Sequence, residues 1–169
     1  HSNMPLLLQE SCTMDGIDRK LVHLLQEDAS QSAAELGEAV GLSATSCWRR
    51  IQRLRDRGVL TRRVELVDRK AVNLGLMALV EIQATNHSAA WLEQFVSGIE
   101  GFPEIVDAWR TSGQVDYILR VVVPDIAAYD DFYRRMTRAI DFAGFRSIFV
   151  MEDLKNTTAL PLDYVGSGA

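Results

Sequence analysis

Arginine is concentrated in one short segment of this 169-residue chain. Between Ser43 and Arg63, seven arginines stand with a single acidic residue, Asp56. Guanidinium groups suit phosphate oxygens and the guanine edges in the major groove of DNA. Most charged helix faces are merely solvated, but a solvated helix usually mixes both signs of charge to gain i,i+4 pairs. The segment therefore favours a nucleic-acid contact, with a solvated face as the alternative.

A second candidate site lies at residues 111–116. The Asp116 carboxylate could hold the ammonium group of a small zwitterion, and Gly113 would let the backbone come close to it. From residue types alone, the simpler interpretation is that both residues only shape a hairpin, with Asp116 paired to Arg110 or Arg120. Both interpretations stay open at this point.

Other kinds of chemistry find little support in the sequence. His23 and His87 are the only histidines beyond the first residue, and they fall on separate predicted elements. No glycine-rich phosphate loop or nucleophile motif is present. The two cysteines, Cys12 and Cys47, have no metal-ligand spacing and make no disulfide framework. We expect a non-enzyme with no catalytic residues, no metal and no cofactor.

The composition also indicates where the protein works. No apolar run approaches the roughly 20 residues of a membrane-spanning helix, so we expect no membrane partner. Free thiols and the lack of an export signal predict the cytoplasm. Residues 1–3, His-Ser-Asn, resemble the remnant of an expression tag and are excluded from the fold.

The charge is divided between two parts of the chain. Residues 15–64 hold nine basic and seven acidic side chains, whereas residues 65–169 hold nine basic and fifteen acidic ones, within a total of −5. This asymmetry predicts two domains with different partners.

The first part has the pattern of a helix-turn-helix. Apolar residues recur at helical spacing after Asp15, which is placed to cap the first helix. Ser32 and Glu35 form a capping-box pattern at the start of a second helix, and Gly41 suits its end. Ser43 then caps a third helix that reaches Asp56. So short a turn between two helices is the helix-turn-helix spacing.

The third helix is expected to present two faces at about 100° per residue. Cys47, Ile51 and Leu54 form a buried stripe, with the polar and basic residues opposite. Trp48 lies at the edge of the stripe and is expected to pack over a neighbouring helix. Gly58 to Val64 follows as a turn and strand in the place of a wing. The predicted DNA-binding residues are Ser43, Thr45, Ser46, Arg49, Arg50, Gln52, Arg53, Arg62 and Arg63.

Within this set we assign two roles. Thr45, Ser46, Arg49 and Gln52 are expected to reach base edges, which carry sequence information. Arg50, Arg53, Arg62 and Arg63 are expected mainly to neutralise phosphate, which positions the protein on the duplex.

The second part predicts a β-α-β-β-α-β order, the ferredoxin-like unit, so the whole chain is α+β. The strands are expected at 76–85, 104–111, 115–123 and 145–154, with helices from Ala89 to Ile99 and after Asp125. In the third strand, residues of both faces are apolar, but the helices cover only one face of such a sheet. A second copy of the sheet is the expected cover, which predicts a homodimer.

Together these motifs resemble the leucine-responsive regulator/AsnC family of transcriptional regulators, from about Asp15 to Leu162. In the first part the resemblance rests on the pairs Asp15-x-x-Asp18 and Arg50-x-x-Arg53-Leu54, with Ala34-Glu35-Leu36, Val40-Gly41-Leu42-Ser43, Cys47 and Gly58-Val59. In the second part it rests on Ser112-Gly113-x-x-Asp116-Tyr117 and Val150-Met151-Glu152. The sequences Cys47-Trp48-Arg49-Arg50, Trp109-Arg110, Gln114-Val115-Asp116-Tyr117, Tyr129-x-x-Phe132-Tyr133 and Thr157-Thr158-Ala159-Leu160-Pro161 resemble its cysteine-responsive subgroup.

The resemblance implies a winged helix-turn-helix, a linking strand and a C-terminal domain that binds an amino acid. It also implies homodimers that assemble into octamers, with the effector bound between dimers. Many members carry an acidic residue where this chain has Gln114, which puts the identity of the ligand in doubt. The effector-binding residues implied are Thr111, Ser112, Gly113, Gln114, Asp116, Ser147 and Glu152.

We therefore expect a sequence-specific DNA-binding regulator whose activity responds to a small amino acid, L-cysteine being the candidate. The alternative is an amino-acid-binding regulatory subunit of an enzyme or assembly, without specific DNA binding. The expected boundaries are 1–13 for the tag remnant and N-terminal tail, 14–63 for the winged helix-turn-helix, 64–75 for a linking strand and turn, 76–162 for the effector and oligomerisation domain, and 163–169 for a tail.

Overall fold

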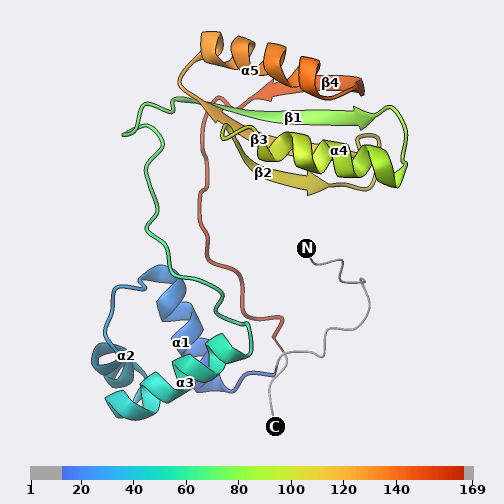
Figure 1. The fold of residues 1–169 in the computed structure, drawn as a ribbon. Helices are drawn as coiled ribbons and strands as arrows, with labels where there is room; N and C mark the ends of the chain where they lie inside the picture. The colour runs from blue at the N-terminus through green and yellow to red at the C-terminus, as the bar shows by residue number, and fades with distance from the viewer. Residues whose placement is uncertain (1–12, 166–169) are drawn as a thin grey trace. The chain divides into compact units, whose positions relative to one another are not determined.

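The computed structural model describes residues 13–165, so Cys12 and the presumed tag residues lie outside the described part. The chain forms two compact units (Figure 1). Within the described range, one unit comprises residues 13–65 together with 155–165, and the other comprises Leu66–Leu154. Among the described residues, no helix has the length and apolar character needed to cross a membrane.

Three helices make up most of the first unit, and each begins at a predicted cap. The side chains of Asp15, Ser32 and Ser43 each accept a backbone N–H from the first helical turn, and Glu35 completes the capping box. Gly41 ends the second helix with a φ of 74°, which a residue without a Cβ adopts without strain. The helices are α1 (Gly16–Glu27), α2 (Ala33–Val40) and α3 (Ala44–Asp56).

The C-terminal segment, residues 155–165, packs on these helices. Leu162 and Val165 contact an apolar cluster that includes Leu54 of α3. The side-chain amide of Gln26 in α1 also binds both backbone groups of Leu160, at 2.7 Å and 3.2 Å. By contacts, residues 155–162 group with the helical unit, whereas the predicted boundary placed them in the second domain. Of their apolar side chains, Leu162 is half-buried against the helices and Leu160 is 71% exposed.

The predicted wing and linking strand do not form. Gly58 makes the expected turn with a φ of 72°, but residues 61–68 adopt neither helix nor strand. A β-strand needs a second strand to receive its hydrogen bonds, and the single chain offers no such strand here. Residues 59–75 are therefore an extended connection that ends in a turn at residues 69–73.

The second unit is the expected ferredoxin-like α+β domain. Its four strands form an antiparallel sheet in the order β2-β3-β1-β4. The last strand begins and ends earlier than predicted, because the chain beyond Phe149 leaves the sheet. The elements are β1 (Leu76–Ala84), α4 (Ala89–Glu100), β2 (Ile105–Arg110), β3 (Tyr117–Val123), α5 (Ile126–Ala139) and β4 (Phe142–Phe149).

Both helices cover the same face of this sheet. Phe95 of α4 and Phe132 of α5 are fully buried against alternate strand residues such as Val80 and Leu119. The other face remains open and partly apolar, with Trp109 47% exposed and Ile148 42% exposed. Two ion pairs, Glu81–Arg146 and Asp107–Arg120, join neighbouring strands on that face.

Candidate nucleic-acid interface and effector site

The predicted faces of α3 are confirmed. Cys47, Ile51 and Leu54 are buried, whereas Thr45, Ser46 and Arg49 are exposed. Burial raises the pKa of the Cys47 thiol, so the side chain stays protonated and packs as a small apolar group. The stripe fixes which side of the helix faces outward.

The capping residue Ser43 has a local task at the start of α3. Its hydroxyl oxygen accepts the backbone N–H of Ser46 at 3.2 Å, and the hydroxyl donates to Ser46 Oγ at 3.0 Å. Both serines are exposed, but their hydroxyl groups already serve each other. Ser43 therefore positions the helix end, and its contact with DNA stays a prediction.

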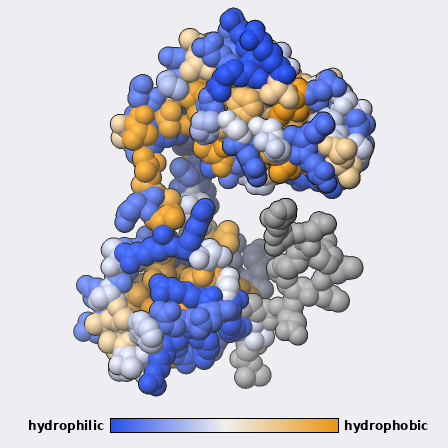
Figure 2. All heavy atoms as spheres, viewed as in Figure 1, coloured by the Kyte–Doolittle hydropathy of each residue, from blue (hydrophilic) through white to orange (hydrophobic). Residues whose placement is uncertain are grey.

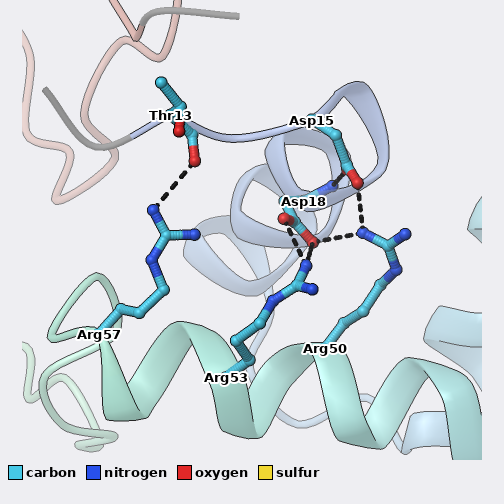
Figure 3. A network of polar contacts seen from close by, with 6 residues as sticks. All are labelled: Thr13, Asp15, Asp18, Arg50, Arg53 and Arg57. Carbon is cyan, nitrogen blue, oxygen red and sulfur yellow. Dashed lines mark hydrogen bonds and ion pairs between the residues drawn. The ribbon is translucent and has the colours of Figure 1, made fainter. Parts of the chain in front are cut away.

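Two of the arginines on α3 bind carboxylates at the start of α1, those of its capping residue Asp15 and of Asp18 (Figure 3). Arg50 Nη1 lies 2.6 Å from Asp15 Oδ2 and 2.8 Å from Asp18 Oδ1. Arg53 Nη2 lies 2.9 Å from Asp18 Oδ2. Asp18 is only 2% exposed, so these guanidinium groups compensate a buried carboxylate.

This network bears on two interpretations made from the sequence. Arg50 and Arg53 were expected to neutralise phosphate, but the two carboxylates already balance their charges, which leaves little attraction for a further anion. The apparent excess of like charge on α3 is also smaller than its own sequence indicates, because the compensating acids belong to α1. The matched spacing of Asp15-x-x-Asp18 and Arg50-x-x-Arg53 was the available signal.

The hydrogen bond from Arg50 lowers the pKa of the Asp15 carboxyl below its usual value. In the same network Arg57, which follows α3, donates to the backbone carbonyl of Thr13 at 3.0 Å (Figure 3). Ion pairs and hydrogen bonds therefore fix the side of α3 that faces α1. The adjoining side of α3 is fixed by the apolar packing of the buried stripe.

Other arginines keep their charge available. Within residues 13–165, Arg49, Arg55 and Arg62 are exposed and form no ion pair. Arg63 is also exposed, although its charge acts on Asp28. Figure 2 shows hydrophilic side chains gathered over α3 on the face turned to the viewer. These arginines, together with Thr45, Ser46 and the half-buried Gln52, form the candidate nucleic-acid surface.

Trp48 departs from its predicted place. It was expected to pack over a neighbouring helix, but it is 55% exposed. Its position on α3, one residue after the buried Cys47, turns the indole away from α1 and α2 toward the outer face. The sequence did show the position of Trp48 on the wheel, but the known preference of tryptophan for packing misled the prediction.

In the second unit, residues 111–116 form a closed hairpin. Thr111 donates its N–H to the Asp116 carbonyl at 2.8 Å and its hydroxyl to the Val115 carbonyl at 2.6 Å. Gly113 has a φ of 138°, and a Cβ added there would meet no atom within 4 Å. The backbone at the tip of the hairpin is thus open on its outer side. Ser112 and Gln114 are exposed beside it.

Asp116 is held by groups other than those predicted. Its Oδ2 accepts the Ala84 N–H at 2.9 Å, and its Oδ1 lies 3.8 Å from Nδ1 of His87. Arg120 pairs instead with Asp107, and no ion pair joins Asp116 to Arg110 among residues 13–165, so the pairing that the simpler interpretation of the hairpin supposed does not form. A half-buried carboxylate with one oxygen fixed by the backbone leaves the other oxygen able to receive a cation.

The remaining predicted effector residues lie elsewhere in the domain. The Ser147 hydroxyl bonds to the Tyr129 hydroxyl of α5, on the helix-covered face. Glu152 follows Val150, which bonds to Met77 at one end of β1, whereas Asp116 bonds to Ile82 near the other end. At about 3.4 Å per residue, those two points of β1 are roughly 17 Å apart. One chain therefore does not bring Glu152 to the hairpin.

No cluster of three or more potential metal ligands occurs among residues 13–165.

Two family models match this chain. The AsnC-type helix-turn-helix domain matches residues 14–55, and the Lrp/AsnC ligand binding domain matches residues 77–160. Except for one terminal residue each of α3 and β1, the first range spans α1 to α3 and the second spans the sheet and its helices.

Several regulators are similar over nearly their full length. The DNA-binding transcriptional activator DecR of Escherichia coli K12 is 42% identical over 151 residues, which cover 89% of this chain and 99% of that protein. The glutamate uptake regulatory protein of Zymomonas mobilis is 40% identical over 149 residues, which cover 88% of this chain and 91% of that protein.

Two solved structures share the fold closely. An AsnC family transcriptional regulator from Agrobacterium tumefaciens is 51% identical with a TM-score of 0.86, covering 89% of this chain and 99% of the other. A transcriptional regulator from Neisseria meningitidis, solved as a complex with L-methionine, is 30% identical with a TM-score of 0.85, covering 89% and 98%.

Proposed function

The chain belongs to the Lrp/AsnC family of DNA-binding transcriptional regulators, and on that premise we propose that it binds specific operator DNA under the control of a small amino acid. The observation that carries the proposal is the outer face of α3. It exposes unpaired arginines next to short polar residues, while the inner side of the helix is fixed by packing and ion pairs. Its relatives are named as regulators rather than enzymes, so we also propose a non-catalytic role, in the cytoplasm, where such a regulator meets DNA.

On DNA, we propose that a dimer places two copies of α3 in successive major grooves, about 34 Å apart. Arg49 is the proposed contact to base edges, with Gln52, Thr45 and Ser46 beside it. Arg62 and Arg63 lie beyond the helix and are proposed to contact phosphate. Arg50 and Arg53 leave this set, because Asp15 and Asp18 engage them.

This division is tested by footprinting on the DNA upstream of the gene, followed by affinity measurements on the protected fragment. Arg49→Ala should reduce the preference for that fragment over random DNA, because it removes a base contact. Arg62→Ala should weaken both DNAs about equally and reduce the salt slope by about 1. Equal loss of specificity from both variants would refute the assignment. Absence of salt-dependent binding would favour an amino-acid-binding subunit that does not act on DNA.

For the effector, we propose that Asp116 holds the ammonium group and that backbone N–H groups near Gly113 receive the carboxylate. The support is the free side of the Asp116 carboxylate and the open hairpin tip. A neighbouring structure contains L-methionine, and the sequence resemblance to the cysteine-responsive subgroup makes L-cysteine our first candidate. Because Glu152 is remote in one chain, a second dimer would have to supply it, as an octamer could.

Calorimetric titration with L-cysteine, L-methionine and L-glutamate tests the effector site. Asp116→Asn keeps the shape and the bond from Ala84 but removes the charge, so it should weaken binding at least tenfold. Asp131→Asn, the same change at an exposed aspartate of α5, is the matched control. A titration in which Asp116→Asn binds as tightly as the original chain would eliminate the ammonium contact.

A further inference from the structure

We propose that Trp48 contacts thymine, by packing its indole against the 5-methyl group that thymine presents in the major groove. This inference rests on the proposed DNA binding through α3. It adds to the polar contacts of Arg49 an apolar contact that distinguishes thymine from cytosine.

The rotation of α3 places Trp48 on the DNA-facing side. Cys47, Ile51 and Leu54 are buried, so they define the inward direction. At about 100° per residue, Trp48 lies roughly 100° from Cys47, and Arg49 lies roughly 100° further. Thr45 and Gln52 fall between Trp48 and Arg49 on the wheel. The four side chains therefore share one arc, which runs from Trp48 at the flank of the stripe to Arg49 on the opposite face.

Arg50 and Arg53 lie on the other flank of α3 and point toward α1 (Figure 3). The helix therefore has one side bound to its own domain by charge and one side, with Trp48, that is outward and uncommitted. A DNA groove approached by the outer arc would meet Trp48 and Arg49 together.

No packing partner among residues 13–165 explains the exposure of Trp48. The indole is 55% exposed, and none of the ring contacts among the described residues involves it. In contrast, Trp91 is buried in the second unit and stacks on Phe95. Trp48 is thus an apolar ring beside the polar side chains of Thr45, Arg49 and Gln52. The major-groove edge of a base pair that contains thymine has the matching composition, since it is polar except for one methyl group.

For Trp48, contact with the edge of a base is favoured over insertion of the indole between stacked bases. Apolar side chains that unstack base steps generally enter from the minor groove and kink the duplex. A recognition helix lies in the major groove, where the bases remain stacked and only their edges are accessible. The methyl group is the apolar feature of those edges, so it is the partner that the indole can meet.

The test uses the fragment protected in footprinting, with each thymine replaced in turn by deoxyuridine. This change removes only the methyl group and keeps the base pairing. For the original chain, one replacement in each half-site should weaken binding about fourfold, the effect of burying one methyl group. For Trp48→Ala, binding should be weaker at the start and should no longer respond to that replacement. Val96→Ala, a change at an exposed apolar residue of α4 away from the open face of the sheet, should respond like the original chain.

A second measurement does not depend on the Trp48 variant. Deoxyuridine carrying iodine in place of the methyl group should cross-link on irradiation to the peptide that contains Trp48. Cross-linking only to other peptides, or a Trp48→Ala protein that still loses fourfold on methyl removal, would overturn the contact. If the original chain binds the fragment tightly and no thymine replacement matters, the inference fails while the proposed function stands. If it binds no DNA, the proposed function fails as well.

Discussion

Asp18 is the residue on which the orientation of α3 depends most. It is 2% exposed and accepts hydrogen bonds from both Arg50 and Arg53. Removal of one partner from a buried charge network leaves the others without compensation, which is costly even where the complete network contributes little.

We expect Asp18→Ala to lower the free energy of unfolding of the helical unit by about 2–3 kcal/mol, toward the low end for buried pairs because Arg53 is half exposed. Urea denaturation followed by circular dichroism measures the change. Asp56→Asn, a change at an exposed acid at the end of α3, should alter stability by no more than about 0.5 kcal/mol. A similar loss in both variants would mean that charge in general, and not this network, stabilises the unit.

Asp15 gives the same network a pH dependence. Its pKa is lowered from the usual 3.8, mainly by the hydrogen bond from Arg50. The folded state therefore binds the proton more weakly than the unfolded state, so the contribution to stability is present above about pH 4 and is lost as the pH falls through the folded pKa.

Asp15→Asn should keep the helix cap but remove this part of the acid sensitivity. Because the Asp15 side chain is 45% exposed, solvent screening limits the effect to under about 1 kcal/mol. Urea midpoints at pH 3, 5 and 7 report it. The difference between the variant and the original chain should be the same at pH 5 and 7 and smaller at pH 3. A constant difference at all three values would contradict the assignment.

For these residues, the sequence predicted which face of α3 is buried better than it predicted which residues its side chains contact. The spacing of Cys47, Ile51 and Leu54 was sufficient to orient α3, because helical geometry fixes that relation. Which acid Arg50 meets depends on how α3 crosses α1, and the direction in which Trp48 leaves the helix depends on where the neighbouring helices end. Neither follows from the periodicity of one segment.

Among the elements, the turn between α2 and α3 has a strict steric requirement. Gly37 is buried in α2, and a Cβ there would lie 2.7 Å from the Leu42 backbone carbonyl and 3.4 Å from the Ser43 carbonyl carbon. Gly16, at the start of α1, has no atom within 4 Å of the corresponding position.

Alanine is a better helix former than glycine by about 1 kcal/mol, so intrinsic propensity alone would make both replacements stabilising. We expect Gly16→Ala to be neutral or stabilising, and Gly37→Ala to destabilise by about 1–2 kcal/mol, because the Leu42 backbone must move. Thermal unfolding of the two variants compares them directly. Stabilisation by Gly37→Ala would show that the turn adjusts without strain.

The elements also show where local patterns stop being informative. Capping residues predicted the starts of α2 and α3 correctly, because a cap is a contact within one turn. The C-terminal segment has no such pattern, and its attachment through Gln26 and Leu162 joins residues more than a hundred positions apart. The predicted wing strand failed for a related reason, since a strand depends on a partner that sequence periodicity does not identify.

For the whole molecule, the order of helices and strands predicted the ferredoxin-like unit, and its connectivity follows from that order. In a single chain, the apolar residues on the open face of this sheet are left without a covering layer. Leu79 lies on this face beside Ile148, its partner in β4, and Trp109 lies across the sheet in the edge strand β2. The ion pairs Glu81–Arg146 and Asp107–Arg120 already neutralise the charges among them. A neutral, partly apolar sheet suits a second copy of itself.

We therefore expect Ile148→Lys to convert a dimer into monomers, because each copy would place an uncompensated charge in the shared apolar surface. Light scattering after size-exclusion chromatography measures the mass. Val96→Lys is the matched control, since Val96 is similarly exposed at 44% but lies on α4, away from the open face. Because two half-sites require two copies of α3, the Ile148→Lys monomer should also lose most of its operator affinity, whereas Val96→Lys should keep both its mass and its affinity. A dimer that survives Ile148→Lys but not Val96→Lys would place the interface on the helices instead.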